Sequence, residues 1–216
     1  MMSSESLMST DDALDLIAES LDTPTQAAGL LRALVEHPSP EVRMRALEAL
    51  IYVEHPETVA TAARALGDSD ALVRIAAIEV LTAQGREEHG QAIWRLALED
   101  PDSLVREHAL LNLSALGGVL DVGSLVQLAK TSTGAILVAS ANLLCAQGHR
   151  EWLLPLLEGL FDPEYTTRAM TLTLLEERIE PQERPFVRRL LIDRRAVEDA
   201  PAVLARMDAL LAAWSD

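Results

Sequence analysis

The chain has 216 residues, of which 49% are hydrophobic but only 3% aromatic, and its 34 acidic and 18 basic residues give a net charge of −16. A core with so few aromatic rings must be built from Leu, Ala, Val and Ile, which suits closely packed helices. The negative charge repels phosphate backbones and attracts basic protein surfaces, so we expect a protein partner with a basic surface and no nucleic-acid partner.

The sequence also argues against a membrane or secreted protein. No apolar run approaches the roughly 20 residues that a membrane-spanning helix needs. The N-terminal stretch lacks the basic start and the apolar core of a secretory signal. Cys145 is the single cysteine, so no intrachain disulfide is possible and a reducing compartment fits. We therefore expect a cytoplasmic protein with no membrane partner.

The N-terminal part is predicted to contain a disordered segment and a capping helix. Residues 1–8 are expected to be disordered. A helix over residues 11–22 follows, with Ser9 or Thr10 available as its N-cap. Its apolar positions fall on one side, and they are Leu14, Ile17, Ala18 and Leu21. This lone acidic helix is typical of the end of a repeat array, where the outer face must be polar.

A sequence pattern then recurs at a period of about 31 residues. Its copies are HPSPEVRMRALEALIYVE from His37, DSDALVRIAAIEVLTAQG from Asp68, DPDSLVREHALLNLSALG from Asp100, TSTGAILVASANLLCAQG from Thr131 and DPEYTTRAMTLTLLEERI from Asp162. The seventh residue of each copy, called the anchor here, is Arg43, Arg74, Arg106, Leu137 and Arg168 in turn. The seventh residue after each anchor is always leucine: Leu50, Leu81, Leu113, Leu144 and Leu175. Glycine closes three copies, at Gly85, Gly117 and Gly148.

A second helical segment precedes or follows each copy. These segments lie at roughly 24–36, 56–67, 87–99, 120–130, 150–161 and 181–192, and their apolar residues recur at three- and four-residue spacing. Each repeat is therefore a helical hairpin, which must stack on its neighbours to bury its apolar faces. A last helix at about 201–214 opens with Pro201 and caps the array.

The predicted fold is all-α: a right-handed α-solenoid of about six stacked helical hairpins with N- and C-terminal capping helices. We predict a single domain over residues 9–216. Its repeats are expected near 24–53, 56–85, 87–117, 120–148, 150–179 and 181–214.

The pattern D-P-x-x-x-V-R-x-x-A-L-x-x-L-x-x-x-G resembles HEAT-like repeats of the short bacterial kind, first described in phycobilin lyase subunits, over roughly residues 24–200. Such a resemblance implies a fold more than a function, because these repeats serve many roles. It also implies a ladder between adjacent repeats, made of the Asp before the second helix of each repeat and the Arg inside that helix. By resemblance, the ladder residues are Asp68, Arg74, Asp100, Arg106, Asp162 and Arg168.

The fourth copy departs from the pattern. Leu137 stands where the other copies have Arg, and Thr131 replaces the Asp, so one rung of the ladder is missing. Two interpretations remain open. The irregularity is either a place where a partner inserts, or drift that is compensated by apolar packing.

The outward side of each second helix is the predicted partner-binding surface, because in HEAT-like stacks this side lines the concave groove. At 100° per residue, the second, fifth and ninth residues after the anchor lie there, with the first residue beside them. The predicted partner-binding residues are Arg45, Glu48, Tyr52, Glu79, Glu107, His108, Leu111, Asn142, Thr173 and Glu177. An apolar track accompanies them, made of Met44, Ile75, Leu111, Val138 and Met170. The alternative is that these apolar residues pack sideways against neighbouring repeats and only the polar ones face water.

No constellation for catalysis emerges from the sequence. The five histidines are scattered and show no metal-ligand spacing, and no phosphate-binding loop or nucleophile elbow is present. We therefore predict a protein that is not an enzyme, with no catalytic residue, no metal and no cofactor.

The function that fits these features best is protein binding. An acidic concave face would capture a basic partner quickly, and the most concrete version is an inhibitor, or immunity protein, for a basic bacterial toxin. The alternatives are a scaffold or adaptor, or an accessory subunit of an enzyme complex such as a lyase. A nucleic-acid enzyme is the last alternative, because it would need a basic concave face.

Overall fold

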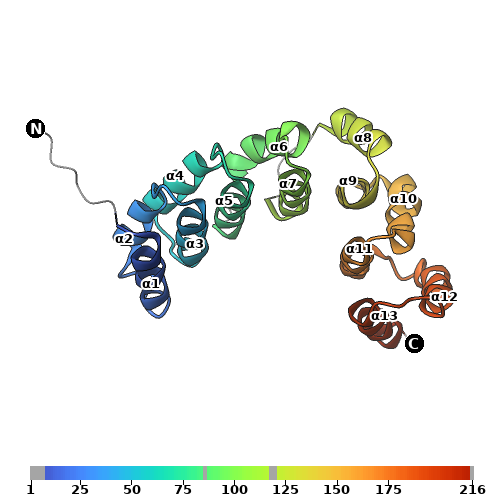
Figure 1. The fold of residues 1–216 in the computed structure, drawn as a ribbon. Helices are drawn as coiled ribbons and strands as arrows, with labels where there is room; N and C mark the ends of the chain where they lie inside the picture. Colours follow the sequence, from blue (N-terminus) through green and yellow to red (C-terminus); the bar gives the residue numbers. More distant parts are fainter. Residues whose placement is uncertain (1–7, 85–86, 117–120, 215–216) are drawn as a thin grey trace, which may run out of the picture. The chain divides into compact units, whose positions relative to one another are not determined.

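The structure is a computed structural model that describes residues 8–84, 87–116 and 121–214. Every regular element in these ranges is an α-helix or a short 3-10 helix, and none of the described residues forms a strand (Figure 1). The predicted all-α class is thereby confirmed. The segment 1–8, predicted to be disordered, lies outside the described residues except for Met8.

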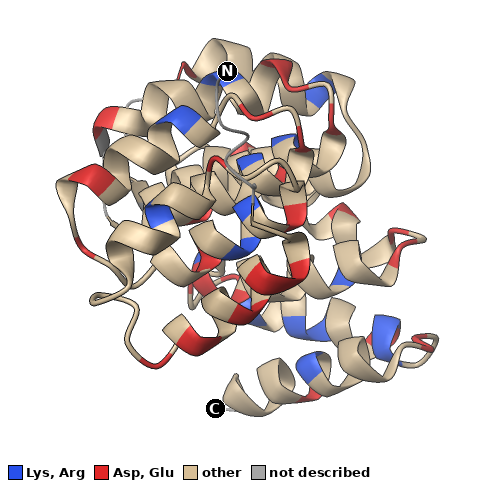
Figure 2. Ribbon diagram, turned by 60° about the vertical axis from the view of Figure 1, so that its left-hand side comes forward, with Lys and Arg blue, Asp and Glu red and all other residues tan. Residues whose placement is uncertain are grey.

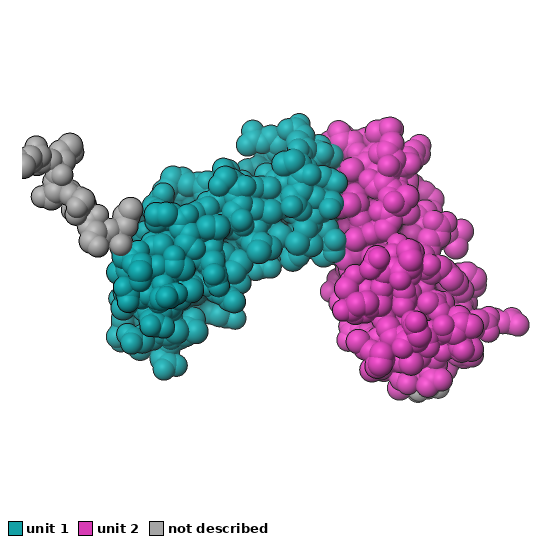
Figure 3. Space-filling view, in the orientation of Figure 1, with its two compact units in different colours: residues 1–118 teal, residues 119–216 magenta. Residues whose placement is uncertain are grey.

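The chain divides into two compact units, Met1–Gly118 and Val119–Asp216 (Figure 3). Each unit has its own buried core of aliphatic residues. The prediction of a single domain over residues 9–216 stays a prediction.

Unit 1 consists of helical hairpins packed in two layers (Figure 1). In one layer, α1, α3, α5 and α7 lie side by side, and α2, α4 and α6 form the other layer. The bounds are α1 Thr10–Ser20, α2 Ala28–Leu34, α3 Pro40–Leu50, α4 Pro56–Ala65, α5 Ala71–Ala83, the 3-10 turn η1 Glu87–His89, α6 Gly90–Glu99 and α7 Ser103–Leu116.

The helix starts of unit 1 follow from local chemistry. Ser9 caps α1 by accepting a hydrogen bond from the backbone N–H of Asp12, which decides between the two predicted cap residues. Asp70 caps α5 by accepting from the N–H groups of Leu72 and Val73. Proline occupies the first turn of α3 and α4, where its missing N–H has no helical partner to lose.

Unit 2 repeats this arrangement. Its helices α9, α11 and α13 lie in one layer, and α8, α10 and α12 lie in the other (Figure 1). The bounds are α8 Val122–Thr131, α9 Gly134–Ala146, η2 Arg150–Trp152, α10 Leu153–Glu158, η3 Gly159–Phe161, α11 Tyr165–Arg178, α12 Arg184–Arg195 and α13 Pro201–Ala213.

The leucines seven residues after the anchors all lie in the cores of their units. Leu50, Leu81, Leu144 and Leu175 are fully buried, and Leu113 is nearly so. Each buried leucine side chain contributes roughly 1.5–3 kcal/mol by leaving water. The sequence period therefore marks the core-facing side of each second helix, and the positions two and five residues after the anchor point elsewhere.

Glycine ends α9 as predicted. Gly148 has φ of 90°, and the next residue, His149, donates its N–H to the carbonyl of Leu144. This left-handed turn closes the helix at low cost because glycine has no Cβ. The other two closing glycines, Gly85 and Gly117, lie outside the described residues.

Two predicted helical segments are not continuous α-helices, and the first of them, 87–99, consists of η1 and α6. The segment 150–161 was expected to be continuous, but it consists of η2, α10 and η3. Gly159, between α10 and η3, lies against α9 and α11: a Cβ there would overlap Val138 Cγ2 and Thr171 Oγ1. This close approach gives the physical reason for a glycine, a poor helix former, inside the segment.

Candidate functional site

The second helices of unit 1 carry most of the predicted partner-binding residues. The surface formed by these residues is called the α3–α5–α7 face here, and it comprises Arg45, Glu48, Tyr52, Glu79, Glu107, His108 and Leu111. All seven residues are exposed or half-buried. Figure 2 shows acidic and basic positions on helices of both units. Because α3, α5 and α7 are neighbours in one layer, these residues belong to one continuous helical layer.

Two ion pairs organise the charges of this face. Arg45 Nη1 lies 2.9 Å from Glu48 Oε2, within α3. His108 Nδ1 lies 3.7 Å from Glu79 Oε1, which joins α7 to α5. The side chains of Glu48 and Glu79 are 42% and 40% exposed. Both carboxylates therefore remain open to solvent while each has a nearby cationic or protonatable group, and exposed pairs of this kind add little to folding stability.

Tyr52 is the most exposed large hydrophobic residue of the face, with 82% of its surface accessible. It follows the C-terminal end of α3. A tyrosine offers a large apolar area and a hydroxyl for a modest loss of side-chain freedom, which is why the residue is enriched in interfaces. Leu111 on α7 is only half-buried and adds a second apolar group.

Glu107 differs from the other two acids. It is half-buried, and burial raises its pKa above the ordinary value, although the nearby charge of His108 opposes the rise. Glu107 therefore loses its negative charge at a higher pH than a fully solvated glutamate does.

The three remaining predicted residues lie in unit 2, and one of these predictions is wrong. Asn142 is fully buried, and its Oδ1 accepts a hydrogen bond of 2.8 Å from Arg178 Nε. Its position on α9 is enclosed because α9 packs against α8, α10 and α11. Thr173 and Glu177 on α11 are exposed, and Glu177 lies 3.5 Å from Arg178.

The predicted apolar track is also interrupted. Ile75 and Val138 are 7% and 1% exposed, so they pack inside their units and present no surface. The other three members of the track, Met44, Leu111 and Met170, are half-buried. The alternative of sideways packing therefore holds for Ile75 and Val138.

The ladder residues join consecutive repeats through paired hydrogen bonds. Arg43 Nε and Nη2 donate to Asp68 at 2.8 and 2.7 Å, and the same two atoms of Arg74 donate to Asp100 at 2.8 and 2.7 Å. Each rung thus runs from the anchor of one repeat to the Asp that opens the next copy. Arg43 is the first arginine of the ladder, which was expected to begin at Asp68.

The environment of Asp68 favours its charged form in the folded protein. Burial alone would raise its pKa, but the hydrogen bonds from Arg43 and from the backbone N–H of Asp70 outweigh it and lower the pKa below the ordinary value. A carboxylate held in this way stabilises the contact between two repeats and does not offer a charge to a partner.

The ladder ends differently from the prediction. The main partner of Arg168 is a glutamate: its Nε and Nη2 donate to Glu198 at 2.8 and 2.7 Å, and Nη2 also lies 3.4 Å from the exposed Asp199. Arg106 donates to the carbonyls of Asp100 and Pro101 and has no carboxylate partner among the residues that the structure describes. The sequence analysis did not identify Glu198. The available signal was an acidic residue just before the last helix, about one period after the final anchor.

Two of the histidines have structural roles in turns and helix caps. His37 and His55 each accept a hydrogen bond from a backbone N–H two residues on, as turn and cap residues do.

Within the described ranges, no three His, Cys, Asp or Glu side chains gather in a way that could hold a metal ion. No helix in those ranges has the length and apolarity to cross a membrane. The expected lack of a metal, a cofactor and a catalytic residue stays a prediction.

The thiol of Cys145 is expected to be unreactive in the folded protein. The residue is 5% exposed, and burial raises the pKa of the thiol to about 11, against the opposing charges of Arg150 and Arg178. Since the thiolate is the nucleophile, we expect the reaction with 5,5′-dithiobis(2-nitrobenzoate) at pH 8 to be roughly 100-fold slower than in guanidinium-unfolded protein. Equal rates in the two conditions would mean that the thiol is accessible.

With this geometry in place, comparison with known proteins identifies the repeats. A family model described as HEAT repeats matches residues 27–114. Residues 27–114 therefore form HEAT-like repeats. No curated protein matches the chain. The matched residues lie within unit 1 and contain every residue of the α3–α5–α7 face.

The HEAT match explains why the face lies where it does. HEAT repeats generally mediate protein interactions, and the matched hairpins leave the outward positions of α3, α5 and α7 exposed or half-buried. The resemblance to the bacterial, phycobilin-lyase kind of repeat stays a prediction.

Proposed function

We propose that the protein is a non-catalytic binding protein whose α3–α5–α7 face docks a partner protein with a basic surface. The observation that carries this proposal is the exposure of Glu48 and Glu79 on neighbouring helices of matched HEAT repeats. Tyr52 beside them supplies an apolar anchor. Carboxylates at this exposure steer an oppositely charged surface and set the rate of association more than the final affinity.

The most concrete form of this function is inhibition of a basic bacterial toxin, as an immunity protein does. The net charge of −16 supports it, because a strong negative field raises the rate at which a basic protein is captured. A scaffold or adaptor for a protein complex, or an accessory subunit of an enzyme, uses the same repeat surface and is the second candidate, supported by the breadth of roles of HEAT repeats.

The experiment that tests the proposed function is affinity capture with the purified full chain in an extract of its source organism, followed by mass spectrometry. We expect one basic protein to be enriched, and its association with the chain to slow strongly as salt increases. A toxin that loses activity when bound would support the inhibitor form, and an enzyme subunit or several co-captured proteins would support the second candidate. Absence of any saturable protein partner would contradict both.

Charge reversal on the α3–α5–α7 face is expected to slow association with the captured partner. The variants Glu48→Lys and Glu79→Lys should each lower the association rate several-fold at low salt, and the double variant should lower it by about tenfold or more. Stability should change by less than about 1 kcal/mol, because the affected ion pairs are exposed. Surface plasmon resonance at two salt concentrations measures the rates.

A matched control separates the face from the net charge. Glu99 is an exposed acid at the end of α6, in the other layer of unit 1. The variant Glu99→Lys makes the same change in net charge, and we expect its association rate to fall much less than that of Glu79→Lys. Equal slowing in the two variants would assign the effect to the general field and would contradict docking at the α3–α5–α7 face.

A further inference from the structure

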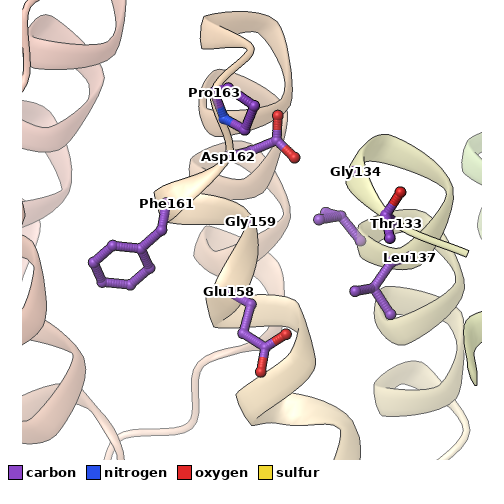
Figure 4. A pocket seen from close by; sticks show the side chains of 9 residues that line it. Thr133, Gly134, Leu137, Glu158, Gly159, Phe161, Asp162 and Pro163 are labelled. Carbon is purple, nitrogen blue, oxygen red and sulfur yellow. The ribbon is translucent and has the colours of Figure 1, made fainter.

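Unit 2 contains a cavity of about 270 Å³ between α9 and the segment that leads from α10 into α11. Its lining includes Gly134, Leu137, Glu158, Phe161 and Asp162 (Figure 4). A cavity of this size lies below the roughly 300–1,000 Å³ of most small-molecule sites. It therefore suits a single inserted side chain better than a larger ligand.

The cavity lies where the ladder lacks a rung between the fourth and fifth copies. Leu137 occupies the anchor position of the fourth copy, and Asp162 opens the fifth copy 25 residues later. Arg43 and Asp68 have the same separation and form a closed rung. Asp162 is therefore the acceptor half of a rung whose arginine is replaced by leucine. The cavity with Asp162 and Leu137 is called the vacant rung below.

The closed rungs show which group this geometry holds. In each of the three, Nε and Nη2 of an arginine donate to the two carboxylate oxygens at 2.7–2.8 Å. Nη1 of the same arginine donates to the carbonyls of the residues six and five positions before it. The planar guanidinium fork matches the planar carboxylate, which a lysine ammonium cannot do.

The acceptor groups of the vacant rung remain available. Asp162 Oδ1 accepts a hydrogen bond of 2.9 Å from the N–H of Glu164, and Oδ2 lies against Gly134. Glu158 also lines the cavity. The described part of the chain supplies no ion-pair partner within 4 Å for either carboxylate. In Figure 4 both side chains point toward α9, while the ring of Phe161 points away from it.

We propose that the vacant rung receives the guanidinium of an arginine side chain from a partner protein, which binds Asp162 as the chain's own arginines bind their rung carboxylates. This inference rests on the protein-binding function proposed above. Glu158 stabilises the inserted charge from the other end of the cavity. The methylene stem of the arginine packs on Leu137, as arginine stems do on apolar surfaces.

Binding of an isolated arginine side chain to the full chain tests the site directly. The probe is N-acetyl-arginine N-methylamide, and its controls are the blocked citrulline, which is neutral and nearly isosteric, and the blocked lysine. In an NMR titration of the labelled protein, we expect saturable shifts of the amides of Gly134, Asp162 and Glu164 with the arginine probe. Citrulline and lysine should bind at least tenfold more weakly, and Asp162→Asn should weaken the arginine probe at least tenfold.

Two substitutions at the anchor complete the test. Leu137→Arg should close the rung within the chain, abolish binding of the probe and leave the helical circular dichroism unchanged. Leu137→Met keeps an apolar side chain and should bind the probe like the wild type. If Leu137→Arg fails to fold, the Asp162→Asn titration still decides the matter. Equal binding of arginine and citrulline, or binding that is indifferent to Asp162→Asn, would overturn the proposal.

Further measurements distinguish a partner protein's arginine from free arginine, and a failure of the vacant rung from a failure of the proposed function. Free L-arginine should bind no more tightly than the blocked probe; much tighter binding would indicate a small-molecule site and overturn the partner-protein assignment. A captured partner that depends on Glu48 and Glu79 but binds Leu137→Arg and Asp162→Asn normally would overturn the vacant rung alone. Saturable binding of the probe without any protein partner would instead contradict the proposed function.

Discussion

Replacement of Glu198 by alanine is expected to destabilise the folded protein by about 3–5 kcal/mol, the range typical when one partner of a buried ion pair is removed. The side chain of Glu198 is fully buried and that of Arg168 is 6% exposed. The substitution leaves the buried Arg168 guanidinium with only the exposed Asp199 3.4 Å away, and it removes the partner of Arg194. It also removes the acceptor for the N–H groups of Asp199 and Ala200, at the start of α13.

The measurement is urea denaturation at pH 7, followed by circular dichroism. A matched control is Asp208→Ala, which removes the partner of Arg195 from an exposed pair in the same unit and should change the stability little. If Glu198→Ala and Asp208→Ala had the same small effect, the Arg168 rung would contribute nothing beyond a surface contact.

The pH dependence of the same residue has a defined sign. The hydrogen bonds from Arg168 lower the pKa of Glu198 to about 2 from an ordinary value of 4.5, although burial by itself would raise it. A depressed pKa in the folded state stabilises the protein above the unfolded value and loses that contribution as the pH falls toward 2. Wild-type stability should therefore drop below about pH 4.5 more steeply than that of Glu198→Gln, which has no charge to lose.

Much of the fold was predictable because a repeat presents the same physical evidence several times. The anchor and the leucine seven residues later fall on one side of a helix, and every such leucine is buried. Proline at a first turn and aspartate at an N-cap are local signals, so Pro201 placed the start of α13 correctly. These features need no knowledge of the neighbouring repeat.

The site was harder to predict because exposure depends on what packs against each helix. The same rotation from the anchor leaves Glu79 exposed on α5 but buries Asn142 on α9, since α9 has neighbours on several sides and Arg178 provides a partner for the amide. Glu198 was not identified from the sequence for another reason. It lies 30 residues after Arg168, whereas the first rung spans 25 residues, so the Arg-to-acid separation of the first rung does not reach it.

The ladder itself allows a comparison of one closed and one vacant rung. Asp100→Ala should destabilise the protein by about 3–5 kcal/mol, because Asp100 is buried and pairs with the buried Arg74. Asp162→Ala should cost only about 0.5–1.5 kcal/mol, the net value of one intramolecular hydrogen bond. Both aspartates accept a hydrogen bond from the N–H two residues on, each at 2.9 Å. The difference between the two variants therefore isolates the arginine rung.

Urea denaturation combined with hydrogen exchange of the helices on either side of each aspartate measures the two effects, because the residues lie in different units. Equal losses for Asp100→Ala and Asp162→Ala would mean that Asp162 already has a strong cationic partner, and the vacant rung would not exist. In the Leu137→Arg variant, Asp162→Ala should become as costly as Asp100→Ala, since the introduced arginine would couple to this carboxylate. A coupling that appears only when the arginine is supplied would show that the rung between the fourth and fifth copies retains its acceptor, Asp162, and lacks only its donor.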